Sequence, residues 1–259
     1  MYRGFKLQIE PNSYLPYQEI GHNLFDQQQY VVRPILQKYI LSDDVINGTQ
    51  MQENWFPQMD AHVFISHSHQ DSALAQGLAG WLHETFGIKA FVDSTIWGYA
   101  EDLLRLLDNK FCLQDGGPLF DYQRRNYSTA HVYMMLQNAL SKMIDSCESI
   151  FFLNTPNSTV ESIIKTSTNS PWIYSELSLT ALIRKKTPQR FLTEINKSFS
   201  EQQRSLLESH RLKIEYQLDL GHLISLTTSD IVDWKHNCTR LLQTGPTQVL
   251  DQLYQLKPL

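Results

Sequence analysis

The sequence predicts an α/β fold with a doubly wound, mostly parallel sheet of about five strands and helices on both faces. Two observations lead to this class. Short apolar runs suited to buried strands recur from residue 60 onward, and segments with apolar residues at helical spacing separate them. Such alternation favours parallel strands, because the helices that connect them cover both faces of the sheet. With 259 residues and 42% hydrophobic residues, the chain can bury a sizeable core.

The strands and helices of this pattern can be assigned in order along the chain. Strands are expected at 61–65, 89–93, 149–153 and 212–216, with a further strand at 221–226. Helices are expected at 72–86, 101–108, 128–143, 171 onward, 194–209 and 246 onward. The helix from 72 has Leu74, Leu78, Trp81 and Leu82 on one face, and Gly87 is placed to end it. We expect 94–100 to be a loop.

Two segments depart from the alternation. Residues 1–58 are rich in aromatic residues, Gln and Asn, with one plausible helix near 28–41. We expect them to form an N-terminal extension that packs on the main domain, which then covers 59–259. The stretch 109–127 contains Gly116, Gly117 and Pro118, and we expect it to be an insertion in that domain.

Composition excludes several classes of function. The formal net charge of −5 gives no basic surface for nucleic acid. Cys112, Cys147 and Cys238 are isolated thiols, which argues against a disulfide framework or a structural zinc site and favours a reducing cytoplasm. No signal peptide or membrane span is expected. Glycine motifs typical of dinucleotide-binding dehydrogenases and P-loop enzymes are missing, as is the nucleophile elbow of serine hydrolases.

Glu176 is the leading candidate for a catalytic residue. Ser170 is a good helix N-cap and Pro171 suits the first helical position. Trp172 and Glu176 then share one helix face, at positions i and i+4. A carboxylate beside an aromatic ring can hold a sugar and stabilise positive charge that develops on it. The alternative is an exposed Glu that complements the helix dipole, with Trp172 in the core.

The polar loops of the pattern converge on one edge of the predicted sheet. They follow Ile65, Val92 and Leu153, and the start of the Glu176 helix belongs to the same edge. Ligands of open parallel sheets bind beyond the carboxyl ends of the strands. His67 and His69 could share a face, but no further metal ligands complete a site, so we expect no metal there.

Several of these segments together resemble a bacterial TIR (Toll/interleukin-1 receptor) domain, which has a flavodoxin-like sheet. The first is VFISHSHQD at 63–71, similar to the opening TIR strand and loop. The second is FVDSTIWG at 91–98, similar to the second strand and the BB loop. The third and fourth are FFLNT at 151–155 and SPWIYSEL at 170–177. The resemblance covers about 60–250, and it is to standalone TIR proteins of anti-phage systems such as Thoeris.

This resemblance implies an activity and a set of site residues. Many bacterial TIR domains cleave the nicotinamide–ribose bond of NAD, and Glu176 matches their catalytic glutamate. The substrate-binding residues would be Phe64, Ser66, Trp97, Gly98, Tyr99, Asn154 and Trp172. NAD would be the substrate, with no resident cofactor. The product would be ADP-ribose, a cyclic isomer or a conjugate, acting as a signal for a nucleotide-sensing effector in antiviral defence.

Two other functions remain open from the residues. A non-catalytic TIR adaptor would bind other TIR domains, including copies of itself, through the BB loop. A nucleoside deoxyribosyltransferase has a similar fold and also uses a glutamate on an N-glycosidic bond. For single residues there are alternatives too: Phe64 as a core residue, Trp97 as a loop anchor, Asn154 as a turn residue, and Asp93 as a cap that orients its loop.

Overall fold

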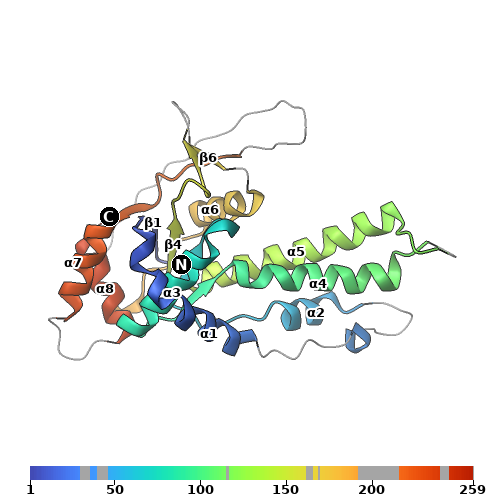
Figure 1. The fold of residues 1–259 in the computed structure, drawn as a ribbon, viewed down its shortest axis with the longest axis horizontal. Helices are drawn as coiled ribbons and strands as arrows, with labels where there is room; N and C mark the ends of the chain where they lie inside the picture. The colour runs from blue at the N-terminus through green and yellow to red at the C-terminus, as the bar shows by residue number, and fades with distance from the viewer. Residues whose placement is uncertain are drawn as a thin grey trace.

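A five-stranded parallel sheet forms the centre of the chain in the computed structural model (Figure 1). The structure describes residues 1–29, 36–39, 46–114, 117–161, 166–168, 170–191, 216–239 and 245–258. The sheet has the order β3-β2-β4-β1-β8. Its strands are β1 (Arg3–Gln8), β2 (Val63–Ser66), β3 (Ala90–Val92), β4 (Ser149–Leu153) and β8 (Ile224–Thr227). Every neighbouring pair is parallel, which confirms the predicted doubly wound α/β class.

The strand β1 corrects the expected role of the first residues. They do not only pack on the domain from outside, because β1 lies inside the sheet between β4 and β8. Leu7 is in register with Leu153 on one side and with Leu226 on the other. Phe5 and Leu7 are buried. The polar residues Lys6 and Gln8 alternate with them and hide the strand in the sequence. A strand of only six residues with this pattern is easily taken for an extension.

The described part of the expected strand at 212–216 does not belong to this five-stranded sheet. Only its last residue falls in the described chain, and Tyr216 belongs to β7 (Tyr216–Gln217). That strand forms an antiparallel sheet with β5 (Val160–Glu161) and β6 (Thr166–Thr168). The neighbour of β4 on the side away from β2 is β1. The expected helix at 194–209 and most of that at 28–41 lie outside the described residues.

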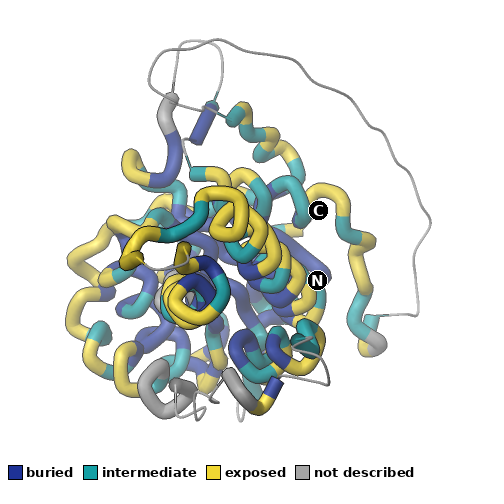
Figure 2. The backbone as a smooth tube through the Cα atoms, turned by 90° about the vertical axis from the view of Figure 1, so that its right-hand side faces the viewer, coloured by how far each residue is buried: buried dark blue, intermediate teal, exposed yellow. Residues whose placement is uncertain are grey.

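Helices cover both faces of the sheet. One face carries α3 (Ser72–Phe86), α7 (Thr228–Thr239) and α8 (Pro246–Leu256), and α1 (Gln18–Gln29) packs against α3. The other carries α2 (Gly48–Trp55), α4 (Ser94–Phe111), α5 (Tyr122–Ser146) and α6 (Pro171–Leu182). The strands divide their side chains between the two faces: Val63 and Ile65 lie in the first core, and Phe64 lies in the second. Figure 2 shows the buried backbone at the centre of these layers.

The helices α4 and α5 form a long antiparallel hairpin that extends beyond the sheet (Figure 1). The expected loop at 94–100 is wrong, because α4 already begins at Ser94. The expected insertion at 109–127 supplies the end of α4, the turn and the start of α5, with a bridge between Leu113 and Phe120. No helix in the described part of the chain combines the length and apolar character needed to cross a membrane.

Close contact between backbones joins α1 to α3. A Cβ atom added at Gly21 would lie 2.0 Å from the carbonyl oxygen of Gln76, and one at Gly80 would lie 2.2 Å from that of Tyr17. Glycine is required at both positions, because any side chain would collide with main-chain atoms. The backbones of the two helices therefore pack so closely that no residue larger than glycine fits at these two positions.

Candidate functional site

The candidate site lies where the direction of the chain's crossovers changes, beyond the carboxyl ends of β2 and β4. From β2 the chain passes through α3 on one face to β3, and from β3 it returns through α4 and α5 on the other face to β4. The strands β2 and β4 are neighbours in the sheet, so the segments that follow them separate to opposite faces. In open parallel sheets, ligands usually bind at such a place, beyond the carboxyl ends of the strands.

The side chain of Glu176 is held in this region by the end of β2. Ser66 lies on the same face of β2 as Phe64, two residues earlier, because strand side chains alternate. Its hydroxyl donates a hydrogen bond to Glu176 Oε2 at 2.6 Å, and both residues are almost fully buried. The alternative interpretation of Glu176, as an exposed residue that complements the helix dipole, is therefore wrong.

The helix α6 positions Glu176 through the cap that the sequence predicts. Ser170 is the N-cap, its hydroxyl oxygen accepts a hydrogen bond from the backbone N–H of Ile173, and Pro171 is the first helical residue. Ile173 and Leu177 are buried in the core on this face of the sheet. Glu176 lies between them along the helix, so their burial carries its carboxyl group inward.

A buried ion pair lies beside Glu176. His67 directly follows Ser66, Asp93 directly follows β3, and His67 Nδ1 is 2.6 Å from Asp93 Oδ1. Both side chains are buried. Burial alone would lower the pKa of His67, but the charge of Asp93 and its hydrogen bond outweigh that effect and raise the pKa. The imidazolium and carboxylate forms thus stabilise one another.

The environment of Glu176 favours its protonated form. Burial raises the pKa of its carboxyl group well above the ordinary value of 4.5, the negative charge of Asp93 raises the pKa further, and the Ser66 hydrogen bond lowers it in part. The second carboxyl oxygen, Oε1, finds no donor among the described residues. A buried acid without full solvation and near a second acid holds its proton more tightly.

We expect Glu176→Gln to stabilise the folded chain at neutral pH by roughly 1 to 3 kcal/mol. The folded parent chain keeps a proton on Glu176 where the unfolded chain has released it, so the parent loses stability as pH rises from 4.5 to the raised pKa. Glutamine stays neutral, and its amide N–H can donate toward Asp93. Urea unfolding between pH 4 and 9 should show the difference growing with pH. If the difference in stability between parent and variant did not change with pH, the raised pKa of Glu176 in the folded chain would be wrong.

The structure describes the surroundings of four other predicted site residues. Asn154 lies at the same edge, where its side-chain oxygen accepts from Thr159 Oγ1 at 3.0 Å. Phe64 is fully buried with its ring 5.2 Å from that of Phe91, as its core alternative implied. Trp172 is half-buried and packs edge-on against Tyr133 of α5, with ring centroids 5.7 Å apart. Tyr99 is half-buried on α4 and packs against the core on that face.

Trp97 and Gly98 belong to the first turns of α4, and their side-chain surroundings lie outside the described part of the structure. Their predicted contact with a substrate stays a prediction. The helical backbone at 94–98 nevertheless changes the expected geometry, because these residues belong to a helix that starts at the sheet edge.

The sequence reasoning missed two features of this edge. The ion pair of His67 and Asp93 was not expected, since His67 was considered only as a metal ligand and Asp93 only as a cap. The second feature is Asp71, a buried carboxylate that accepts hydrogen bonds from Thr155 Oγ1 and from Asn157 Nδ2. The available signal was the position of all these polar residues within a few residues of a buried strand's carboxyl end.

Comparisons of the chain with protein-family models, with curated proteins and with solved structures give no significant match. The likeness to TIR domains therefore depends on the sequence motifs alone.

Proposed function

We propose that the chain cleaves the N-glycosidic bond between nicotinamide and ribose in NAD, with Glu176 as the catalytic carboxylate. The observation that carries this proposal is the buried Glu176 carboxyl group, hydrogen-bonded to Ser66 at the carboxyl end of β2. A carboxyl group at the edge where the strands of a parallel sheet end is suited to a sugar whose carbon becomes positive.

In this reaction the bond between ribose C1′ and the ring nitrogen breaks, and its electron pair goes to the nitrogen. Nicotinamide leaves as a neutral molecule, so no strong general acid is needed. The ribosyl cation is then captured by a nucleophile, and with water the products are ADP-ribose and a proton. Capture by another nucleophile gives a cyclic isomer or a conjugate, which would serve as a signal in defence against phage.

The proposed chemistry requires a change in the protonation state of Glu176 when NAD binds. Glu176 must be ionised to stabilise the ribosyl cation, whereas its raised pKa favours the neutral form in the free protein. The nicotinamide ring of NAD carries a positive charge, so its arrival favours the ionised carboxylate. Ser66 keeps Oε2 oriented, while Oε1 is buried and accepts no hydrogen bond from the described residues. The ion pair of His67 and Asp93 holds the ends of β2 and β3 together behind it.

We expect purified protein to release nicotinamide from NAD, and Glu176→Gln to reduce the rate at least about 100-fold, because electrostatic stabilisation of the transition state is lost. Chromatography of the small molecules measures both substrate and products. Glu84→Gln is the matched control, since Glu84 is an exposed glutamate on α3, on the other face of the sheet.

The parent and control proteins should be equally active at high protein concentration. If the parent, Glu176→Gln and Glu84→Gln were all inactive there, or if Glu176→Gln were as active as the parent, the proposed activity would be wrong. An exchange of bases between nucleosides without turnover of NAD would instead identify the deoxyribosyltransferase reaction.

A further inference from the structure

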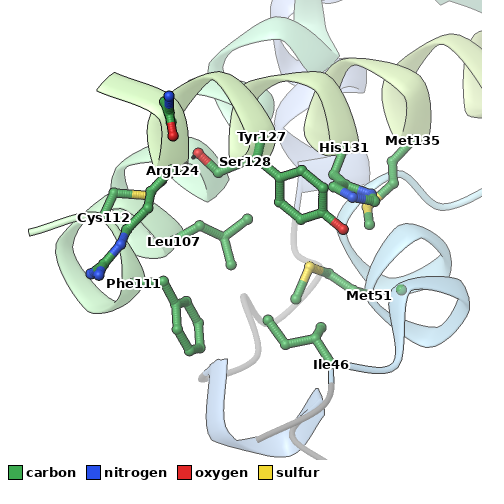
Figure 3. A pocket seen from close by; sticks show the side chains of 12 residues that line it. Ile46, Met51, Leu107, Phe111, Cys112, Arg124, Tyr127, Ser128, His131 and Met135 are labelled. Atoms are coloured by element: carbon green, nitrogen blue, oxygen red, sulfur yellow. Dashed lines mark hydrogen bonds between the residues drawn. The ribbon is translucent and has the colours of Figure 1, made fainter. Parts of the chain in front are cut away.

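A cavity lies away from Glu176, between α2 and the outer half of the α4–α5 hairpin (Figure 3). Its volume is about 670 Å³. The helix α4 begins next to Asp93 in the candidate site, and the cavity starts at Leu107 on the same helix. At 1.5 Å per residue, the two places are roughly 20 Å apart along the helix axis. The cavity is therefore a separate feature from the buried contact between Ser66 and Glu176.

The walls of this cavity are mainly apolar. Ile46 and Met51 come from the α2 side, Leu107 and Phe111 from α4, and Met135 from α5. Figure 3 shows these side chains directed toward a shared space, with the ring of Tyr127 on its α5 side. Sites for small molecules commonly have volumes of about 300–1,000 Å³ and apolar walls with a few polar groups. The cavity meets this description in size and in composition.

Among the described residues that line the cavity, the only one with a fixed charge is Arg124, on α5. His131 also lines it from α5, and no acidic residue is among these described lining residues. The Arg124 side chain is exposed, and its Nη1 donates to the carbonyl of Leu113 across 3.4 Å. Among the described residues, that long bond occupies one of the five guanidinium donors, and the others can meet an anion.

A nearby carboxylate, Asp108, does not offset this positive charge. Asp108 is buried behind the wall, where Oδ2 accepts from Arg125 Nε at 2.9 Å and Oδ1 accepts from Ser128 Oγ at 2.7 Å. Its charge is thus balanced by Arg125, outside the lining residues. The Ser128 hydroxyl and the Cys112 thiol, 3.7 Å apart, line the cavity in front of it.

We propose that this cavity is a binding site for an amphipathic small molecule with an aromatic or aliphatic body and an anionic head group. The body fills the space between Met51, Phe111 and Met135. The head group, a carboxylate or sulfonate, pairs with Arg124 at the edge of the cavity. This proposal depends on the lining residues alone and is independent of the activity proposed for Glu176.

The test uses the full chain and a fluorescent probe of the stated chemistry, 8-anilinonaphthalene-1-sulfonate, which emits strongly when its rings leave water. We expect saturable binding with one site per chain. Arg124→Glu should weaken the binding at least about tenfold, because it places a negative charge beside the sulfonate. Met135→Trp should weaken it similarly by filling the cavity. Dodecanoate should displace the probe, and dodecyltrimethylammonium at the same concentration should not.

Lys142→Glu is the matched control, since Lys142 is exposed on α5 and does not line the cavity. It makes the same change of charge on the same helix and should leave the affinity unchanged. Circular dichroism and thermal unfolding verify that each variant is folded. If Arg124→Glu bound the probe as the parent does, or if Lys142→Glu weakened binding equally, recognition by Arg124 would be wrong. Undiminished binding to folded Met135→Trp would show that the probe binds elsewhere.

Discussion

Replacing His67 with alanine should lower the free energy of unfolding by about 3 to 5 kcal/mol at neutral pH, because it leaves the buried Asp93 carboxylate without its counter-charge. The imidazole is 2.6 Å from that carboxylate, and neither side chain has contact with bulk water that could replace the pair. Glu176 lies beside Asp93, so two acids would then share one dry space. Urea unfolding, followed by tryptophan fluorescence, measures the loss.

The effect of His67→Ala should depend on pH in a defined direction. The pKa of His67 is raised in the folded chain from its ordinary value of 6.5. Its stabilising charge is therefore fully present below 6.5 and is lost as pH rises through the raised pKa. The difference between parent and variant should accordingly shrink at high pH. His69→Ala, which removes an exposed imidazole from the same loop, should change stability by less than about 0.5 kcal/mol at any pH.

If His67→Ala and His69→Ala had equal effects, or if the loss grew toward high pH, the ion pair would not stabilise the fold in the charged form. The first result would remove the electrostatic role of His67, and the second would mean that the neutral imidazole is the form that matters.

Gly21→Ala should destabilise the chain by about 3 kcal/mol, because the added methyl group would lie 2.0 Å from the carbonyl oxygen of Gln76. The prediction is sharp because helix propensity alone gives the opposite sign, a gain of about 1 kcal/mol for alanine over glycine within a helix. Main-chain atoms on both sides cannot rotate away as a side chain could. The helix α1 must therefore move off α3, and the buried contacts between the two are lost.

Thermal unfolding provides the measurement for Gly21→Ala, and Gly117→Ala provides the control. Gly117 is exposed in the turn of the hairpin, and the nearest described atom to a Cβ there would be Leu119 N at 4.0 Å. Its replacement should leave the melting temperature within about two degrees of the parent. A neutral or stabilising effect of Gly21→Ala would show that α1 packs on α3 less closely than the structure indicates.

The sequence predicts most of the sheet because its central strands are continuous apolar runs. Phe64 and Phe152 belong to strands buried on both faces, and such strands are recognisable without partners. The strand β1 was not recognised because Lys6 and Gln8 interrupt its apolar residues. Its place in the sheet depends on pairing with residues far away along the chain, and local pattern carries no such information. The start of α4 is not predicted, because Ser94 and Gly98 are residue types typical of loops.

The candidate site was predictable to a similar extent. The placement of Glu176 near Ser66 follows from a local cap signal and from the general rule that the polar loops of a parallel sheet gather at one edge. The ion pair of His67 and Asp93 follows from neither, because it requires β2 and β3 to be adjacent and in register. The cavity that Arg124 lines is formed where α2, α4 and α5 meet, and no single segment of the sequence indicates it.

The position of β1 also affects how the chain folds during synthesis. Phe5 leaves the ribosome early but pairs with Phe151 and Ile224, which are made much later. The edge strand β8 has only β1 as a neighbour in the sheet, so the two must become ordered together. Ordering such long connections slows folding, because the entropy of the intervening chain is lost before the contacts form. Nascent chains that end before β4 should therefore remain unfolded and depend on chaperones.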